Sequence, residues 1–279
     1  MSVLHAGSHR LSLARPLIMG IVNTTPDSFS DGGRWLDAQA AIRHALKLQE
    51  EGADILDVGG ESTRPGAATV PADEEIRRVL PVIEALARQN CVVSVDTKKP
   101  EVMRAALDAG ASMVNDVMAL QAPGALETVA ASGAAVCLMH MQGDPQTMQQ
   151  APGYADVPGE VKQFLQGRVG ACEAAGIARA RLVIDPGFGF GKTLQHNLAL
   201  LKHLNVLVEL ELPVLVGLSR KSMLGTLTGR EPEQREFAGV AANLMAVARG
   251  ARLLRVHNVA AMRDALAVWN AVEEQQDGT

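Results

Sequence analysis

The sequence predicts an α/β fold, a closed (β/α)8 barrel of the TIM type that forms a single domain. Three observations lead to it: apolar runs of strand length recur, helical periods separate them, and the chain has 279 residues. Barrels of this kind often fill about 250 residues as one domain. An open, doubly wound sheet is the alternative that the same alternation allows. We expect the domain to span residues 1–279, with its core at about 17–275.

Eight apolar runs are the candidate strands. Most of them are continuous rather than alternating, which is typical of strands that are covered on both faces. They lie at residues 17–22, 54–58, 91–95, 112–114, 135–139, 181–184, 213–218 and 252–256.

Between these runs, apolar residues recur with the spacing of one helix face. Residues 76–83 and 262–269 both follow the i, i+3, i+4, i+7 pattern, which predicts helices that pack on a core. Glycines just before five strands predict helix ends, because glycine readily adopts the left-handed conformation that terminates a helix. These are Gly52, Gly110, Gly133, Gly176 and Gly250.

Composition excludes several classes of protein. With 47% hydrophobic and 20% charged residues, the chain is not a disordered polymer. A net charge of −5 argues against a nucleic-acid groove, and 3% aromatic residues are too few for a base-stacking platform. The chain has no run of about 18 uninterrupted apolar residues, which a membrane-spanning helix needs. The N-terminus lacks the apolar core of a signal peptide. We therefore expect a soluble, cytoplasmic protein.

Polar or charged side chains end all eight predicted strands. In a parallel barrel, the carboxyl ends of the strands carry the active site, so this series predicts a functional site at that end. The residues are Asn23, Asp57, Glu61, Asp96, Asn115, Asp116, His140, Asp185, Ser219, Arg220, Lys221, Arg255 and His257.

The glycine-rich segment at residues 185–193 matches neither a phosphate-binding P-loop nor a dinucleotide fingerprint, since its glycine spacing is wrong for both. We interpret it as a backbone that passes close to a flat ligand and presents Phe188 and Phe190 to it. No spacing of His, Cys and Asp resembles a zinc site, and the Arg255–His257 pair suits an oxyanion better than a metal. The cysteines lack a CxxC spacing, and Cys91 and Cys137 lie in apolar runs typical of buried thiols.

Several segments together resemble the dihydropteroate synthase family, in order through all eight βα units. They are residues 23–33, 57–66, 94–97, 115–116, 138–143, 185–192, 219–222 and 255–257, and the first two are signatures of that family. The resemblance implies a transferase of alkyl or aryl groups other than methyl, acting in folate biosynthesis. It would join 6-hydroxymethyl-7,8-dihydropterin diphosphate to 4-aminobenzoate and release pyrophosphate and 7,8-dihydropteroate.

The resemblance also implies the role of individual residues. Asp185 would accept the donor edge of the pterin, Lys221 would reach the ring carbonyl and N5, and Arg255 would stack on the ring. Mg²⁺ would be bound by Asn23 together with phosphate oxygens and water. The pterin site would comprise Asp96, Asn115, Met139, Asp185, Gly217, Lys221 and Arg255, and the diphosphate site Asn23, Thr63, Arg255 and His257.

The resemblance implies that the C–O bond breaks first, that its catalysis is mainly electrostatic, and that the aniline nitrogen attacks last. The residues implied in catalysis are Asp31, Arg64, Asp96, Lys221, Arg255 and His257. The 4-aminobenzoate site would comprise Phe29, Thr63, Arg64, Pro65, Phe190, Lys221 and Ser222.

Two positions depart from the family pattern: Asn258 stands where many relatives have Asp, and Met118 where a polar residue is common. We expect altered loop packing there rather than lost activity. Members of the family are typically homodimers, so the resemblance implies a second copy as partner. A non-catalytic pterin-binding paralogue and a pterin-dependent methyltransferase on the same barrel are the alternative functions.

Overall fold

The structure, a computed structural model, describes residues 2–24, 34–62, 68–144 and 147–273, without the side chains of residues 34–37. Eight parallel strands close into a barrel in the order β10-β3-β4-β5-β6-β7-β8-β9. The last strand pairs with the first, with Leu253 opposite Leu17, which confirms the closed barrel and excludes the open sheet. The strands are β3 (Leu17–Asn23), β4 (Ile55–Gly59), β5 (Val93–Asp96), β6 (Met113–Asp116), β7 (Ala135–Met139), β8 (Leu182–Asp185), β9 (Val214–Val216) and β10 (Ala251–Val256).

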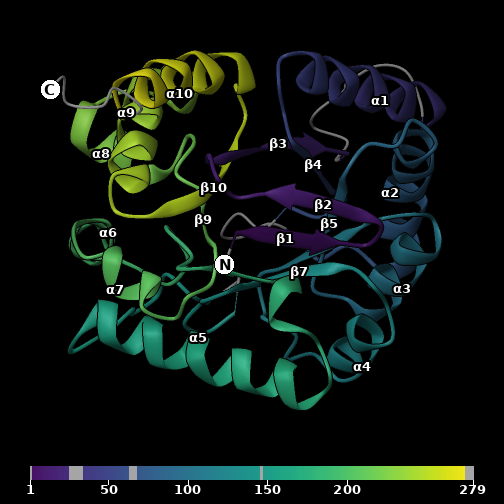
Figure 1. The fold of residues 1–279 in the computed structure, drawn as a ribbon, viewed down its shortest axis with the longest axis horizontal. Helices are drawn as coiled ribbons and strands as arrows, with labels where there is room; N and C mark the ends of the chain where they lie inside the picture. Colours follow the sequence, from purple (N-terminus) through teal and green to yellow (C-terminus); the bar gives the residue numbers. More distant parts are fainter. Residues whose placement is uncertain (1, 25–33, 63–67, 145–146, 274–279) are drawn as a thin grey trace, which may run out of the picture.

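Helices surround the strands as an outer ring (Figure 1). They are α1 (Arg34–Glu50), α2 (Ala72–Ala87), α3 (Pro100–Asp108), α4 (Ala125–Ala130), α5 (Val157–Ala174), α6 (Leu194–Lys202), α7 (Asn205–Val208), α8 (Ser222–Thr228), α9 (Glu236–Val247) and α10 (Val259–Glu273). Two short 3₁₀ turns also occur: η2 (Arg179–Arg181) lies between α5 and β8, and η3 (Pro232–Gln234) lies between α8 and α9.

Alternation along each strand divides the buried residues into two layers, because successive side chains of a strand point to opposite faces. In β3, Ile18 and Val22 belong to the large cluster between strands and helices, whereas Leu17 and Met19 belong to a smaller cluster inside the barrel. The inner cluster also takes one or two side chains from most other strands. The barrel is therefore filled with apolar groups towards the amino ends of its strands.

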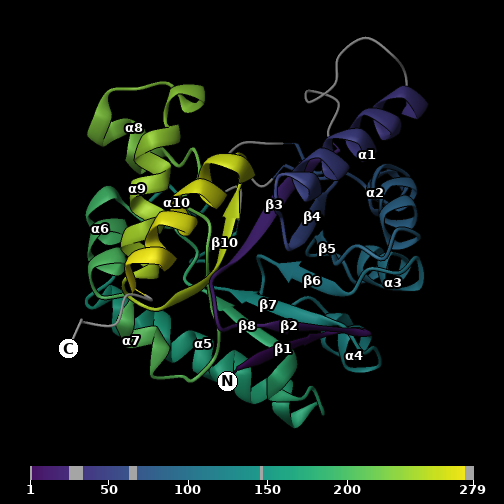
Figure 2. The same cartoon turned by 45° about the horizontal axis from the view of Figure 1, so that its top comes forward.

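An N-terminal hairpin that the sequence analysis did not predict covers this end of the barrel. Strands β1 (Val3–Ala6) and β2 (His9–Ser12) pair antiparallel, with Gly7 in the connecting turn at a φ of 59°. Leu4 and Ala6 are fully buried and join the inner cluster. The hairpin lies across the middle of the helix ring in Figure 1, and in Figure 2 the tips of β3 and β10 point away from it.

Four of the five predicted glycine helix ends are confirmed, and one is wrong. Gly52, Gly110, Gly176 and Gly250 have φ values of 105°, 105°, 87° and 98°. Gly133 does not adopt a positive φ, because Ala131 and Ser132 already end α4. The Gly133 carbonyl instead accepts a hydrogen bond from the Gly7 N–H of the hairpin, at 3.0 Å.

Candidate active site

The site is built by the next inward-facing position of most strands beyond the apolar inner cluster. Ile55 of β4 belongs to that cluster, and Asp57, two residues further, points the same way towards the carboxyl end. The same step of two leads from Leu253 to Arg255 and from Val183 to Asp185. The inward positions at the carboxyl ends are Asp57, Asp96, Asn115, Met139, Asp185, Gly217 and Arg255.

Arg255 links the carboxylates of two other strands. Its Nε donates to Asp57 Oδ2 and its Nη2 to Asp96 Oδ2, both at 2.6 Å. The Asn115 amide donates to the same Asp57 oxygen at 3.1 Å. Four strands are thus connected through side chains, and the guanidinium group is held in one orientation.

Asp57 is the residue of this network to which the sequence analysis gave no role. In the sequence Asp57 is only one of the polar strand ends, yet in the structure it is fully buried and holds both Arg255 and Asn115. The signal that could have found it is its spacing of two from the apolar Ile55, which places it inside the barrel.

Asp96 is the most perturbed carboxyl group of the site. Burial raises its pKa to about 7, the positive charge of Arg255 opposes the shift, and the neighbouring Asp57 carboxylate adds to it. The pKa of Arg255 is raised, because the attraction of Asp57 and Asp96 outweighs the effect of its burial. The guanidinium group is therefore a permanent cation, whereas Asp96 titrates near neutral pH.

Asp185 ends β8 and begins the glycine-rich loop. Its Oδ1 accepts the Gly187 N–H at 2.7 Å, which fixes the carboxylate at the start of the loop. Burial raises its pKa to about 6, while the Gly187 bond and the nearby Lys221 charge lower it. Asp185 is thus an ionised but poorly solvated acceptor at neutral pH.

The two phenylalanines of this loop behave differently. Phe190 is half-buried, and Lys221 Nζ lies 4.2 Å from the centre of its ring. Contact of this ring with the ligand stays a prediction. The prediction is wrong for Phe188, which is 1% exposed and packs in the cluster between strands and helices. The positive φ values of Gly187 and Gly189, 69° and 81°, break the strand alternation that would place both rings on one side.

Lys221 precedes α8 and has its pKa lowered to about 8, mainly by burial, with Arg255 adding to the effect and Asp185 opposing it. His257, two residues after Arg255, places Nδ1 2.9 Å from the Ser219 hydroxyl oxygen. Asn23 is exposed at the end of β3, and Ser222 is exposed as the first residue of α8.

A methionine-rich cluster forms one wall beside the charged groups. Met139 packs with Val117, Met141 and Met148, and the partly buried Met118 and Phe190 contact them. Met118 thus joins apolar packing next to the loop. At the other departure from the family pattern, the Asn258 side chain accepts the Ala261 N–H at 3.0 Å at the start of α10.

Five residues of the predicted site lie outside the described residues. They are Phe29, Asp31, Thr63, Arg64 and Pro65. The remaining predicted residues all lie at the carboxyl end of the barrel. The three cysteines are free and buried, as expected for Cys91 and Cys137.

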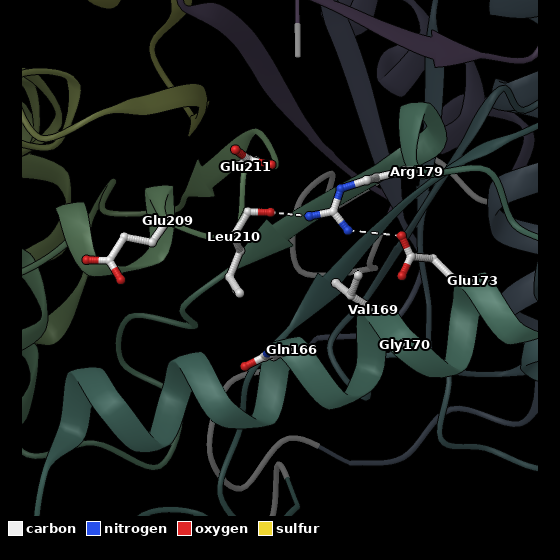
Figure 3. Close-up of a pocket in the computed structure, with 8 residues that line it drawn as sticks. All are labelled: Gln166, Val169, Gly170, Glu173, Arg179, Glu209, Leu210 and Glu211. Carbon is white, nitrogen blue, oxygen red and sulfur yellow. Dashed lines mark hydrogen bonds and ion pairs between the residues drawn. The ribbon is translucent and has the colours of Figure 1, made fainter.

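A surface pocket lies at the opposite end of the molecule (Figure 3). It is formed by α5 and by the segments that precede β8 and β9, so it lies towards the amino ends of the strands. Its one cation, Arg179, already donates to Glu173 and to the Leu210 carbonyl (Figure 3). The pocket therefore plays no part in the site. None of the described helices is long and apolar enough to cross a membrane.

Fold and site together define an enzyme of the (β/α)8 barrel class, with buried carboxylates and cations at the carboxyl ends of its strands. Residues 19–257 match the family of pterin binding enzymes. The chain is 51% identical over 275 residues to the dihydropteroate synthase of Neisseria meningitidis serogroup C, covering 97% of each protein.

Two solved structures of Xanthomonas albilineans dihydropteroate synthase are also similar. One, with 4-aminobenzoic acid, has a TM-score of 0.93 and 58% identity and covers 99% of each chain. The other, in complex with 7,8-dihydropteroate, has a TM-score of 0.90 and 56% identity and covers 98% of this chain and all of that one. The chain belongs to the dihydropteroate synthases of the pterin binding enzyme family.

Proposed function

We propose that this chain condenses 6-hydroxymethyl-7,8-dihydropterin diphosphate with 4-aminobenzoate, giving 7,8-dihydropteroate and pyrophosphate in folate biosynthesis. The observation that carries the proposal is the buried Asp185 carboxylate beside two cations, Lys221 and Arg255, at the carboxyl end of the barrel. A carboxylate beside two cations complements a substrate that has a flat edge of hydrogen-bond donors and a diphosphate leaving group. The relatives with 4-aminobenzoic acid and 7,8-dihydropteroate support the same substrates.

In the pterin site, Asp185 accepts the two N–H donors of the ring edge, and Lys221 donates to the ring carbonyl and N5. The bonds of Arg255 to Asp57 and Asp96 run through the edge of the guanidinium group. Its flat face is therefore left to stack on the pterin ring. Asn115, Met139 and Gly217 complete this site.

The diphosphate is held by the Arg255 and His257 side chains, with Asn23 and Thr63. Mg²⁺ fits the donors present: Asn23 offers one exposed amide oxygen, and no three His, Cys, Asp or Glu side chains of the described ranges form a metal site alone. This ion usually keeps several waters and binds substrate phosphates with few protein ligands. When bound there, Mg²⁺ would neutralise charge on the departing pyrophosphate.

The C–O bond to the diphosphate breaks before the new bond forms, and its electron pair leaves with pyrophosphate. The cation left on the methylene carbon is delocalised into the pterin ring, where the Asp96 and Asp185 carboxylates stabilise it. Arg255 and His257 stabilise the leaving group. The amine nitrogen of 4-aminobenzoate then attacks the methylene carbon and loses a proton.

4-Aminobenzoate binds next to the pterin. Its ring is bordered by the Phe190 ring, the Lys221 stem, Pro65 and Thr63. Lys221 Nζ lies 4.2 Å from the centre of the Phe190 ring. The Ser222 hydroxyl binds its carboxylate. Phe29, Asp31 and Arg64, which lie outside the described residues, complete this site, and Asp31 orients the amine.

We further propose a cytoplasmic homodimer. Large apolar side chains are exposed on three consecutive helices near the C-terminal end of the chain, and such patches are typical of protein interfaces. They are Leu227 on α8, Phe237 and Met245 on α9, and Val268 and Val272 on α10. Phe237, which is 86% exposed, is the residue that we expect a second copy to cover.

A coupled assay of pyrophosphate release, with and without 4-aminobenzoate, tests the proposed reaction. Release that requires both substrates supports the synthase, and release without 4-aminobenzoate, or none at all, contradicts it. Pterin binding without turnover would indicate the non-catalytic paralogue instead.

Arg64→Ala is expected to lower turnover on the order of 10²-fold, as for other transition-state donors, while pterin binding survives. Unchanged kinetics would show that Arg64 takes no part in the reaction.

A further inference from the structure

Lys192, at the end of the glycine-rich loop, has no role in the reaction proposed above. It is only 3% exposed, although a buried ammonium group is costly unless it is hydrogen-bonded. It lies two residues before α6, and its side chain turns back under the loop that carries Asp185 and Phe190.

The Lys192 ammonium group is surrounded by acceptors from two segments. Nζ donates to the carbonyls of Gly187 and Phe190, each at 3.0 Å, and to that of His140 at 3.4 Å. His140 Nδ1 lies 2.9 Å away. Burial and the Lys192 charge lower the pKa of His140 to about 3, so this ring is neutral and its Nδ1 accepts from Lys192 Nζ. Burial also lowers the pKa of Lys192, to about 7, although the Asp185 charge opposes this shift.

The loop has no room to shift towards β7. A Cβ at Gly187 would lie 2.0 Å from the His140 carbonyl oxygen, and one at Gly191 would lie 2.7 Å from that of Gln142. The His140 N–H also donates to the Asp185 carbonyl at 2.9 Å. The loop therefore lies in contact with the end of β7, and Lys192 holds it there.

The consequence reaches the substrate side through Phe190. Its carbonyl is held by Lys192, while its ring lies against Lys221. We propose that Lys192 is a positioning residue: its ammonium group fixes the Gly187 and Phe190 carbonyls against β7 and thereby sets where the Phe190 ring meets 4-aminobenzoate. The inference rests on the proposed function for the identity of that substrate.

Asp185 depends less on this lysine. Its carboxylate is held by the Gly187 N–H and its carbonyl by the His140 N–H, so Lys192 acts on it only through its charge, which lowers the pKa of Asp185 less than the Gly187 hydrogen bond and the Lys221 charge do. The two substrates should therefore respond differently when the ammonium group is removed. That difference separates positioning from a general effect on folding.

The test is Lys192→Met, which keeps the length of the side chain and removes its charge. We expect the KM for 4-aminobenzoate to rise about tenfold, the equivalent of about 1.4 kcal/mol. The KM for the pterin diphosphate should change by less than about threefold, because the contacts of Asp185 remain. Lys202→Met, at an exposed lysine of α6, is the matched control and should leave both constants unchanged.

A loss of folded protein alone lowers the apparent kcat and leaves both KM values as they were, and this result would overturn the proposal. Equal rises in the two KM values would also contradict it. Lys192→Arg, which restores the cation, should recover part of the 4-aminobenzoate KM. If Lys192→Met does not fold, His140→Phe removes the Nδ1 acceptor and keeps the ring; it should raise the same KM, and no change would contradict the proposal.

Amide hydrogen exchange gives a readout that needs no turnover. Faster exchange of residues 187–191 in folded Lys192→Met, with the rest of the barrel unchanged, is expected, and unchanged exchange of this loop would count against the inference. Failure of the wild-type protein to turn over the two substrates would overturn the proposed function, and the exchange result would still decide whether Lys192 holds the loop.

Discussion

Replacing Asp185 with Asn should make the ligand-free protein more stable while removing its ability to bind the pterin. The carboxylate is 6% exposed, and burial raises its pKa to about 6 from the ordinary value of 3.8. A shift of about two units corresponds to about 3 kcal/mol, since one unit is about 1.4 kcal/mol. Asn resembles the protonated form of the carboxyl group and avoids that cost.

The gain depends on pH in a defined direction. Between pH 3.8 and about 6 the folded protein holds the Asp185 proton more readily than the unfolded chain, so this group lowers stability as pH rises. Above pH 6 it is ionised in both states and the full cost is present. The stability difference between Asp185→Asn and wild type should therefore be near zero at pH 3.5 and reach about 2 to 3 kcal/mol at pH 7.5.

Urea unfolding of both proteins across this pH range measures the difference, and calorimetry measures pterin diphosphate binding. Asp264→Asn, at an exposed carboxylate on α10, is the matched control and should show no such pH dependence. A constant difference at all pH values would refute the argument from burial. Wild-type pterin affinity in Asp185→Asn would refute the assignment of this carboxylate to the ring.

Three other substitutions test separate parts of the structure. Asp57→Ala leaves Arg255 with one carboxylate and should lower the free energy of unfolding, measured in urea, by about 3 kcal/mol. It should also lower kcat/KM on the order of 10²-fold, because the guanidinium group is misplaced. An unchanged kcat/KM would show that Asp96 alone positions Arg255. Leu4→Ala, at the base of the barrel, should cost about 3 kcal/mol of stability with an unchanged kcat, and a lowered kcat would link the hairpin to the site. Because the pKa of Lys221 is about 8, kcat/KM should fall about tenfold per pH unit above pH 8. Lys221→Met should abolish this alkaline fall, and a wild-type pH profile in that variant would exclude Lys221 as the group that causes it.

The barrel could be predicted because its strands are covered on both faces and therefore stand out as continuous apolar runs. The site could be located because polar residues end every run. The strand period of two also shows which of them face inward, as at Ile55 and Asp57, but only once the strand boundaries are known.

Pairing within the site could not be predicted from the sequence. Asp57 and Arg255 are 198 residues apart, and only closure of the barrel brings them within 2.6 Å. The different positions of Phe188 and Phe190 depend on glycine dihedral angles that the residue types permit but do not specify. The N-terminal hairpin was missed because its strands have four residues each, too few for a clear period.

That hairpin has a consequence for the order of events during folding. Its buried Leu4 packs in a cluster that contains Leu17 from the first barrel strand and Leu253 from the last. The surface on which the hairpin docks is therefore complete only when β10 has paired with β3. Docking of the hairpin thus follows closure of the barrel and marks its completion.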